Sequence, residues 1–241
     1  MGEGDQPFPD RREAWSSPYR GIEFGITAKW LILGAFLYAL LLLGTMAANT
    51  AEAIWPIVGP SLYCTPFFGL PYVLATINRP GRTRRILFFL ILLPLIHVAA
   101  NYLAWRNAVE NYDELKAGRD LIPNLISGGI GGLAGAALSF GFLEFVQLSS
   151  SQRFERLSLL LGVVLLTAMG ALGLAYGLQL TDALREPRVI SHLVLFYEMI
   201  HFPWQLLFAV LLAWLMRKPR EPRPKRLNWW QRRAVLARAG S

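Results

Sequence analysis

Six long apolar stretches, separated by short polar loops, constrain the fold of this chain more than any other feature of its sequence. A helix needs about 20 apolar residues to cross the ~30 Å hydrocarbon core of a bilayer. Charged residues or prolines bound each stretch, and the stretches are 29–48, 54–77, 85–105, 122–148, 157–180 and 189–216. Because backbone groups cannot stay unpaired in lipid, we expect these stretches to be helices. The sequence therefore predicts an all-α, polytopic membrane protein with a bundle of six transmembrane helices.

The composition favours the same interpretation. The 241 residues are 54% hydrophobic and only 17% charged, whereas soluble globular domains carry about 25% charged residues. A formal net charge of +8 would suggest a nucleic-acid partner in a soluble protein. Here the positive charge falls in the predicted loops and tails, so we expect no nucleic acid to bind. The single cysteine, Cys64, excludes an internal disulfide and a thiolate metal cage.

The distribution of lysine and arginine predicts the orientation of the chain. If the N-terminus lies inside, the inner segments hold 19 of the 24 basic residues and the outer loops hold the other five. Cytoplasmic loops of membrane proteins carry such an excess. We therefore expect both termini in the cytoplasm, with a bacterial inner membrane as the location. The predicted parts are an N-terminal arm (1–28), a six-helix transmembrane domain (29–216) and a basic C-terminal tail (217–241).

Two features are predicted to lie at the cytoplasmic interface. Residues 227–239 have the pattern of a short basic amphipathic helix, in which Trp229 and Trp230 lie among arginines. Such a helix anchors on anionic lipid headgroups, and docking on another protein is the alternative. Glu144 lies near the inner end of the fourth stretch, where we expect an interfacial ion pair or, alternatively, a cytoplasmic gate. Its possible partners are Arg84, Arg85, Arg153 and Arg156.

Glycines in the fourth stretch predict close helix packing. Gly128 and Gly132 are four residues apart, and so are Gly131 and Gly135. Glycine at this spacing clears a flat face, which lets another backbone approach. A narrow wall beside a substrate path is the alternative interpretation.

Prolines in the second stretch predict an irregular helix. The stretch contains Pro56, Pro60, Pro66 and Pro71. Each proline removes a backbone donor and tends to bend a helix. We expect a kink, or a break near Gly59-Pro60, and broken helices mark the binding sites of many transporters. In that interpretation the second stretch gates access to a site.

Polar side chains within the stretches are the candidates for function, because ionisable groups in a bilayer are costly and usually face the bundle interior. His97 and Glu198 are predicted to lie at similar depth in the outer half of the membrane. The predicted site has two further residues one helical turn away and two at its mouth, so that its members are His97, Asn101, Glu198, His201, Ser127 and His192. We expect Glu198 to pair with a histidine, because an unpaired carboxylate there would be protonated or expelled.

Several functions fit this group of residues. It is either a structural staple that holds helices in register or a site for a transported ion, proton or small polar solute. A third possibility is metal or haem ligation by His97 and His201, with Glu198 as a further metal ligand. Hydrolysis is least favoured, because a resemblance to rhomboid intramembrane proteases fails. Leu125 replaces the glycine expected two residues before Ser127.

The sequence thus favours a transporter, or the membrane subunit of a transport or energy-coupled assembly. The alternatives are a non-catalytic accessory or scaffolding subunit and a redox protein with haem or metal. An enzyme is not favoured, and the sequence identifies no cofactor. Other membrane subunits or further copies of the chain are the expected partners. ATP coupling would require one of them, because the chain has no nucleotide-binding motif.

Overall fold

The regular structure of the chain is helical. A computed structural model describes residues 21–48, 58–111, 120–149, 155–181 and 190–218. Within these ranges the helices are α2 (Phe24–Ala48), α3 (Val58–Ala75), α4 (Arg82–Ile86), η1 (Leu87–Leu92), α5 (Leu93–Asn111), α6 (Leu121–Phe145), α7 (Glu155–Thr181) and α8 (Ile190–Leu215). The predicted tail with Trp229 and Trp230, and Pro56 of the second stretch, lie outside the described residues.

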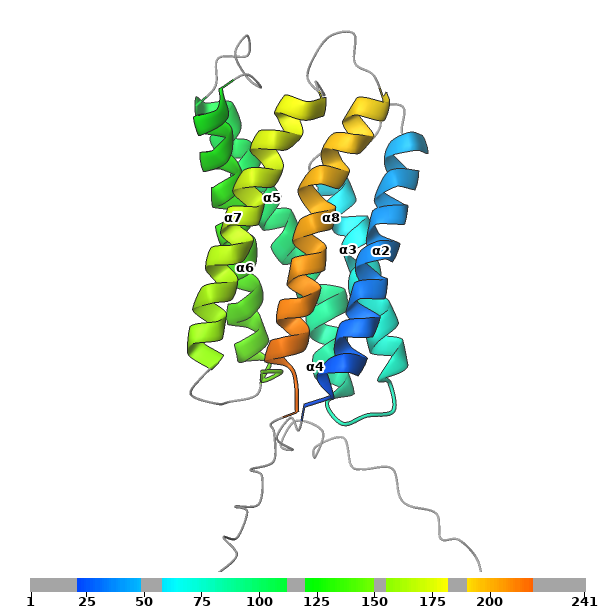
Figure 1. Ribbon diagram of the computed structural model, residues 1–241. Coiled ribbons are helices and arrows are strands. Elements are labelled where there is room, and N and C mark those ends of the chain that lie inside the picture. Colours follow the sequence, from blue (N-terminus) through cyan, green and yellow to red (C-terminus); the bar gives the residue numbers. More distant parts are fainter. Residues whose placement is uncertain (1–20, 49–57, 112–119, 150–154, 182–189, 219–241) are drawn as a thin grey trace, which may run out of the picture.

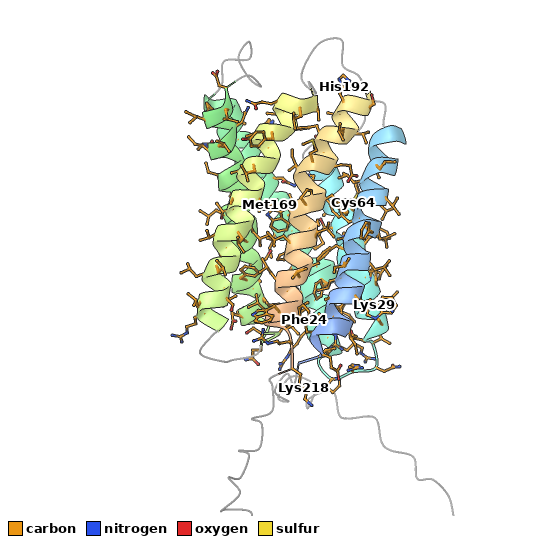
Figure 2. The ribbon with its side chains drawn as sticks, viewed as in Figure 1. Phe24, Lys29, Cys64, Met169, His192 and Lys218 are labelled. Atoms are coloured by element: carbon orange, nitrogen blue, oxygen red, sulfur yellow. The ribbon has the colours of Figure 1, made fainter. Side chains whose placement is uncertain are left out.

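The long helices run up and down beside one another and form a closed ring (Figure 1). Each packs on the next helix along the chain, and α8 packs back on α2. Figure 2 shows His192 at one end of the bundle and Phe24 and Lys218 at the other. We call these the His192 end and the Lys218 end.

The outer surface of the ring is apolar, as a membrane requires. Five helical segments are long and apolar enough to span a bilayer, namely Phe24–Thr45, Arg82–Ala108, Leu121–Phe145, Arg156–Thr181 and Ser191–Leu215. Large apolar side chains are exposed along them, among them Leu40, Ile91, Leu160 and Leu195. Soluble monomers rarely expose an apolar surface of this extent. The chain is therefore a multi-pass membrane protein.

The second predicted stretch gives a shorter helix than we expected. Its apolar part, Leu62–Ala75, is shorter than the five spans and measures about 21 Å at 1.5 Å per residue. Gly59 and Pro60 lie in the first turn of α3, which begins at Val58, and the residues before it lie outside the described ranges. A proline there costs little, since the first backbone N–H groups of a helix have no partner within it. Pro66 and Pro71 lie inside α3.

The third predicted stretch is not one regular helix. Between α4 and α5, the segment η1 forms a π-helix, and at its end the Leu93 N–H donates to the carbonyl of Phe88, five residues back. An α-helix would need the N–H of Pro94 for the carbonyl of Leu90, and proline has none. Such π segments occur often at functional sites, and His97 lies five residues after the end of η1.

The two ends of the described chain are joined at the Lys218 end. The Ile22 N–H donates to the Met216 carbonyl at 3.3 Å, and the Lys218 N–H donates to the Ile22 carbonyl at 2.9 Å. The guanidinium of Arg217 lies over the ring of Trp214, 3.6 Å from its centroid. We call this contact between the segments before α2 and after α8 the terminal clasp. It fixes both described ends of the chain to the same end of the bundle.

The predicted interfacial ion pair of Glu144 is not found within the described ranges. Glu144 is exposed at the end of α6. Arg85 is instead fully buried and uses its guanidinium to cap the end of α3, where it donates to the carbonyls of Pro80, Thr76 and Arg79 at 2.6, 2.7 and 2.8 Å. Arg153 lies outside the described residues.

The glycines of α6 face two different neighbours. An added Cβ on Gly132 would lie 2.8 Å from the Leu166 carbonyl of α7. Gly128 likewise faces the backbone of α7, at Gly170. A Cβ on Gly131 would lie 2.9 Å from that of Ala104 in α5. Gly128 and Gly132 therefore lie where α6 approaches α7, and Gly131 lies where it approaches α5.

A methyl group at Gly132 should destabilise the bundle. Gly132→Ala is expected to lower the free energy of unfolding by about 1–3 kcal/mol, because the backbone of α7 must move away. Gly141→Ala is the matched control in the same helix, since its Cβ would meet nothing within 4 Å. It should be neutral or stabilising by up to about 1 kcal/mol, from helix propensity. Thermal unfolding of both variants in detergent measures the difference, and equal midpoints would contradict the close packing.

Candidate intramembrane binding site

Polar side chains from four helices meet inside the ring. We call these side chains the polar cluster. Its members are Tyr38 of α2, Thr65 of α3, His97 of α5, and Glu198, His201 and Gln205 of α8. Tyr38, Thr65 and Gln205 are fully buried. In the bilayer core no water is available to hydrogen-bond such groups, so their partners within the protein determine their chemistry.

His97 connects three helices through both of its ring nitrogens. Its Nδ1 lies 3.1 Å from Oγ1 of Thr65, and its Nε2 lies 3.3 Å from Nε2 of Gln205. An amide nitrogen only donates, so Gln205 donates and the Nε2 of His97 accepts. The ring proton then sits on Nδ1 and is donated to Thr65. In this arrangement His97 is a neutral imidazole that bridges α3, α5 and α8.

The second imidazole, His201, is held by aromatic packing. Its ring centroid lies 6.4 Å from that of His97 and 5.9 Å from that of Tyr38. Tyr197, one turn earlier on α8, lies parallel to it at 6.1 Å. On the other side of His97, the ring of Trp204 packs edge-on at 5.2 Å. The two histidines therefore sit among aromatic rings.

The expected pairing of Glu198 with a histidine is wrong for the described residues. No ion pair joins them, and the Oε1 atom of Glu198 is buried without a hydrogen-bond partner. The partners of His97 explain this, because Thr65 and Gln205 occupy both of its nitrogens. Glu198 instead lies close enough to Tyr38 and Cys64 to interact with them electrostatically.

The remaining predicted site residues lie at other positions. Ser127 donates to Oδ1 of Asn107 at 2.9 Å and so links α6 to α5. Asn107 is ten residues beyond His97, which is about 15 Å along the helix. His192 is exposed at its end of the bundle, and Asn101 is half-buried one turn after His97.

Two aromatic members of the site were missed by sequence reasoning. Tyr38 contacts both imidazoles, and Trp204 contacts His97. Tyr38 carries the one hydroxyl in the middle of the first apolar stretch, and this signal could have identified it. Trp204 directly precedes Gln205 but looks like an ordinary core residue in an apolar run.

The described residues form no ligand group for a metal ion. No group of three or more histidine, cysteine, aspartate or glutamate side chains in the described ranges is arranged to hold a metal ion. Ligation by His97 would also break one of its two hydrogen bonds. Glu198, His97 and His201 therefore share a region of the bundle without forming a ligand set.

An aromatic layer lies between the cluster and the Lys218 end. Phe208 follows Gln205 by about one turn of α8 and stacks on Phe68 of α3 at 5.7 Å. Phe68 in turn lies 6.4 Å from Phe89. The polar cluster is thus bounded by tightly packed rings on this side.

Loss of the Gln205 amide should leave an unsatisfied imidazole. Gln205→Leu removes the donor to the Nε2 of His97, and an unsatisfied buried polar atom costs about 1–3 kcal/mol. We expect a lower thermal unfolding midpoint in detergent. Gln179→Leu, which changes an exposed glutamine of α7, is the control and should leave the midpoint unchanged. If the two variants behave alike, the His97–Gln205 contact does not stabilise the bundle.

No protein-family model matches the chain, and neither a curated protein nor a solved structure does. The site is therefore interpreted from its own residues. Several long apolar helices around a buried polar cluster make this chain an integral membrane protein.

Proposed function

We propose that the protein is a transporter, or the membrane subunit of a transport or energy-coupled assembly, and that its polar cluster binds a small polar solute or a proton. The observation that carries this proposal is a group of buried polar atoms without hydrogen-bond partners among the described residues. These are Oη of Tyr38, Oε1 of Glu198 and Oε1 of Gln205. Ionisable groups at such positions are expensive and usually mark a path for ions or substrates.

The proposed orientation places the polar cluster in the outer half of the bilayer. The Lys218 end faces the cytoplasm, because 19 of the 24 lysines and arginines then lie inside. The short helix α3 is the sixth crossing in this proposal, which agrees with two chain ends that meet at the terminal clasp. The basic tail beyond residue 218 rests on anionic headgroups of a bacterial inner membrane.

Prolines beside the cluster supply a means of gating. Pro66 of α3 directly follows Thr65, and Pro203 of α8 lies between His201 and Gln205. Each removes one hydrogen bond of its helix, which makes bending easier at that point. Bending of either helix would change the contacts of His97.

A scaffolding subunit is the second candidate, and one observation favours it. His97 already links three helices through two hydrogen bonds. A satisfied polar link of this kind can serve only to hold helices in register. The two candidates differ in what Glu198 does, because its Oε1 atom takes no part in that link.

Replacement of Glu198 separates transport from scaffolding. Proteoliposomes that contain an internal pH dye and carry a potassium diffusion potential report proton flux. We expect flux through the wild type, and a loss of roughly 100-fold or more in Glu198→Gln if the carboxyl carries the proton. Thermal unfolding should change little.

Glu144→Gln is the control for this experiment, because Glu144 is exposed at the Lys218 end, and its flux should equal that of the wild type. A wild type that passes neither protons nor small polar solutes would refute the transport proposal. A Glu198→Gln variant that loses only stability would favour the scaffold.

The orientation has a direct test. In a Cys64→Ala background, a single cysteine replaces either His192 or Lys218. A membrane-impermeant maleimide applied to intact spheroplasts should label the variant at position 192 and label that at position 218 only after lysis. The opposite pattern would reverse the proposed orientation.

A further inference from the structure

The polar cluster contains hydrogen-bond acceptors that have no partner among the described residues. The amide nitrogen of Gln205 is occupied by His97, whereas its Oε1 atom has no partner among the described residues. The Oε1 atom of Glu198 and the Oη atom of Tyr38 are in the same state. The Tyr38 hydroxyl can donate or accept, whereas the oxygens of Gln205 and of an ionised Glu198 only accept. Because buried polar atoms are nearly always satisfied, these oxygens call for a ligand that donates hydrogen bonds.

The acceptors follow one face of α8. Glu198, His201 and Gln205 are spaced by three and four residues, which places them on the same side of the helix. Glu198 and Gln205 are seven residues apart, or about 10 Å along the axis. They therefore mark an outer and an inner position rather than one pocket. Tyr38 of α2 faces this stripe, since its ring contacts both imidazoles.

The surroundings favour a small cation. Glu198 provides the one acidic side chain of the cluster, and neither α3 nor α8 carries a lysine or arginine that could neutralise it. The rings of Tyr38, Tyr197 and Trp204 pack on the two imidazoles, and aromatic faces attract cations.

The way in which a cation contacts oxygen atoms distinguishes a metal ion from an ammonium ion as the ligand. A hard metal cation needs about six oxygen ligands around one point, and the three unpartnered oxygens of the cluster are spread along the helix. An ammonium group instead makes separate N–H bonds to single acceptors and packs against ring faces. It therefore suits the chemistry of this site better than a metal ion.

We propose that the polar cluster binds ammonium or a small primary alkylammonium ion. At the outer position Glu198 supplies the counter-charge and the Tyr38 hydroxyl accepts a hydrogen bond. Oε1 of Gln205 accepts a hydrogen bond from the ion at a second, inner position. The ligand keeps its proton throughout. This inference rests on the proposed function and names the substrate class of the same site.

Binding of methylammonium to the purified full-length protein tests the inference. Isothermal titration in detergent should show saturable binding of methylammonium and competition by ammonium, with no competition by sodium at equal ionic strength. Glu198→Gln should abolish binding. Tyr38→Phe removes one hydroxyl and should weaken binding at least about tenfold, which is the usual cost of losing a hydrogen bond to a charged group.

Matched controls separate the site from general effects. Glu144→Gln and Tyr102→Phe change exposed residues of the same types elsewhere in the bundle, and both should bind like the wild type. Thermal unfolding verifies that each variant is folded. Absence of saturable binding to the wild type, equal competition by sodium, or equal losses in the control variants would overturn the inference.

The outcomes also separate this inference from the function on which it rests. Proton flux that depends on Glu198, together with no methylammonium binding, would overturn the ammonium site and leave transport standing. Binding that depends on Glu198 and Tyr38, without flux of methylammonium or protons in proteoliposomes, would support the site and refute transport.

Discussion

One neutral imidazole, held between a threonine and a glutamine, is the interaction on which the interior of this bundle depends. His97 satisfies both ring nitrogens and thereby joins three helices that are far apart in the sequence. The rings of Tyr38 and Trp204 both pack edge-on against the His97 ring. Because the buried imidazole needs both partners, the positions of α3, α5 and α8 are fixed together.

The glycines of α6 connect the packing of that helix to the polar cluster. A Cβ on Gly135 would lie 3.4 Å from the indole of Trp204 and 3.5 Å from the Cβ of Ala100 in α5. Trp204 therefore uses the space that this glycine leaves, and it packs on His97 from there. The packing of α6 and the geometry of the polar cluster are thus one arrangement.

Hydropathy predicted five of the six stretches as helices long enough to span a membrane, because the requirement for length and backbone pairing in lipid leaves few choices. The second stretch gave a shorter helix than predicted. Hydropathy could not predict which side of each helix faces inward, since the helices are apolar all round and carry no amphipathic stripe. For this reason Glu198 was assigned a histidine partner, while Tyr38 and Trp204 were overlooked. The π segment before His97 was not predicted either, although Pro94, which lacks the N–H that an α-helix would need there, is visible in the sequence.

The terminal clasp has a mechanical consequence. Among the described residues, backbone hydrogen bonds join the segments that flank α2 and α8 at the Lys218 end. These two helices also carry residues of the polar cluster, with Tyr38 on the first and Glu198, His201 and Gln205 on the second. A rocking motion between them would pivot at the fastened end and widen toward the other. Glu198 lies farther from the terminal clasp than the other cluster residues on these two helices. Its carboxylate would therefore be the first of them to contact water.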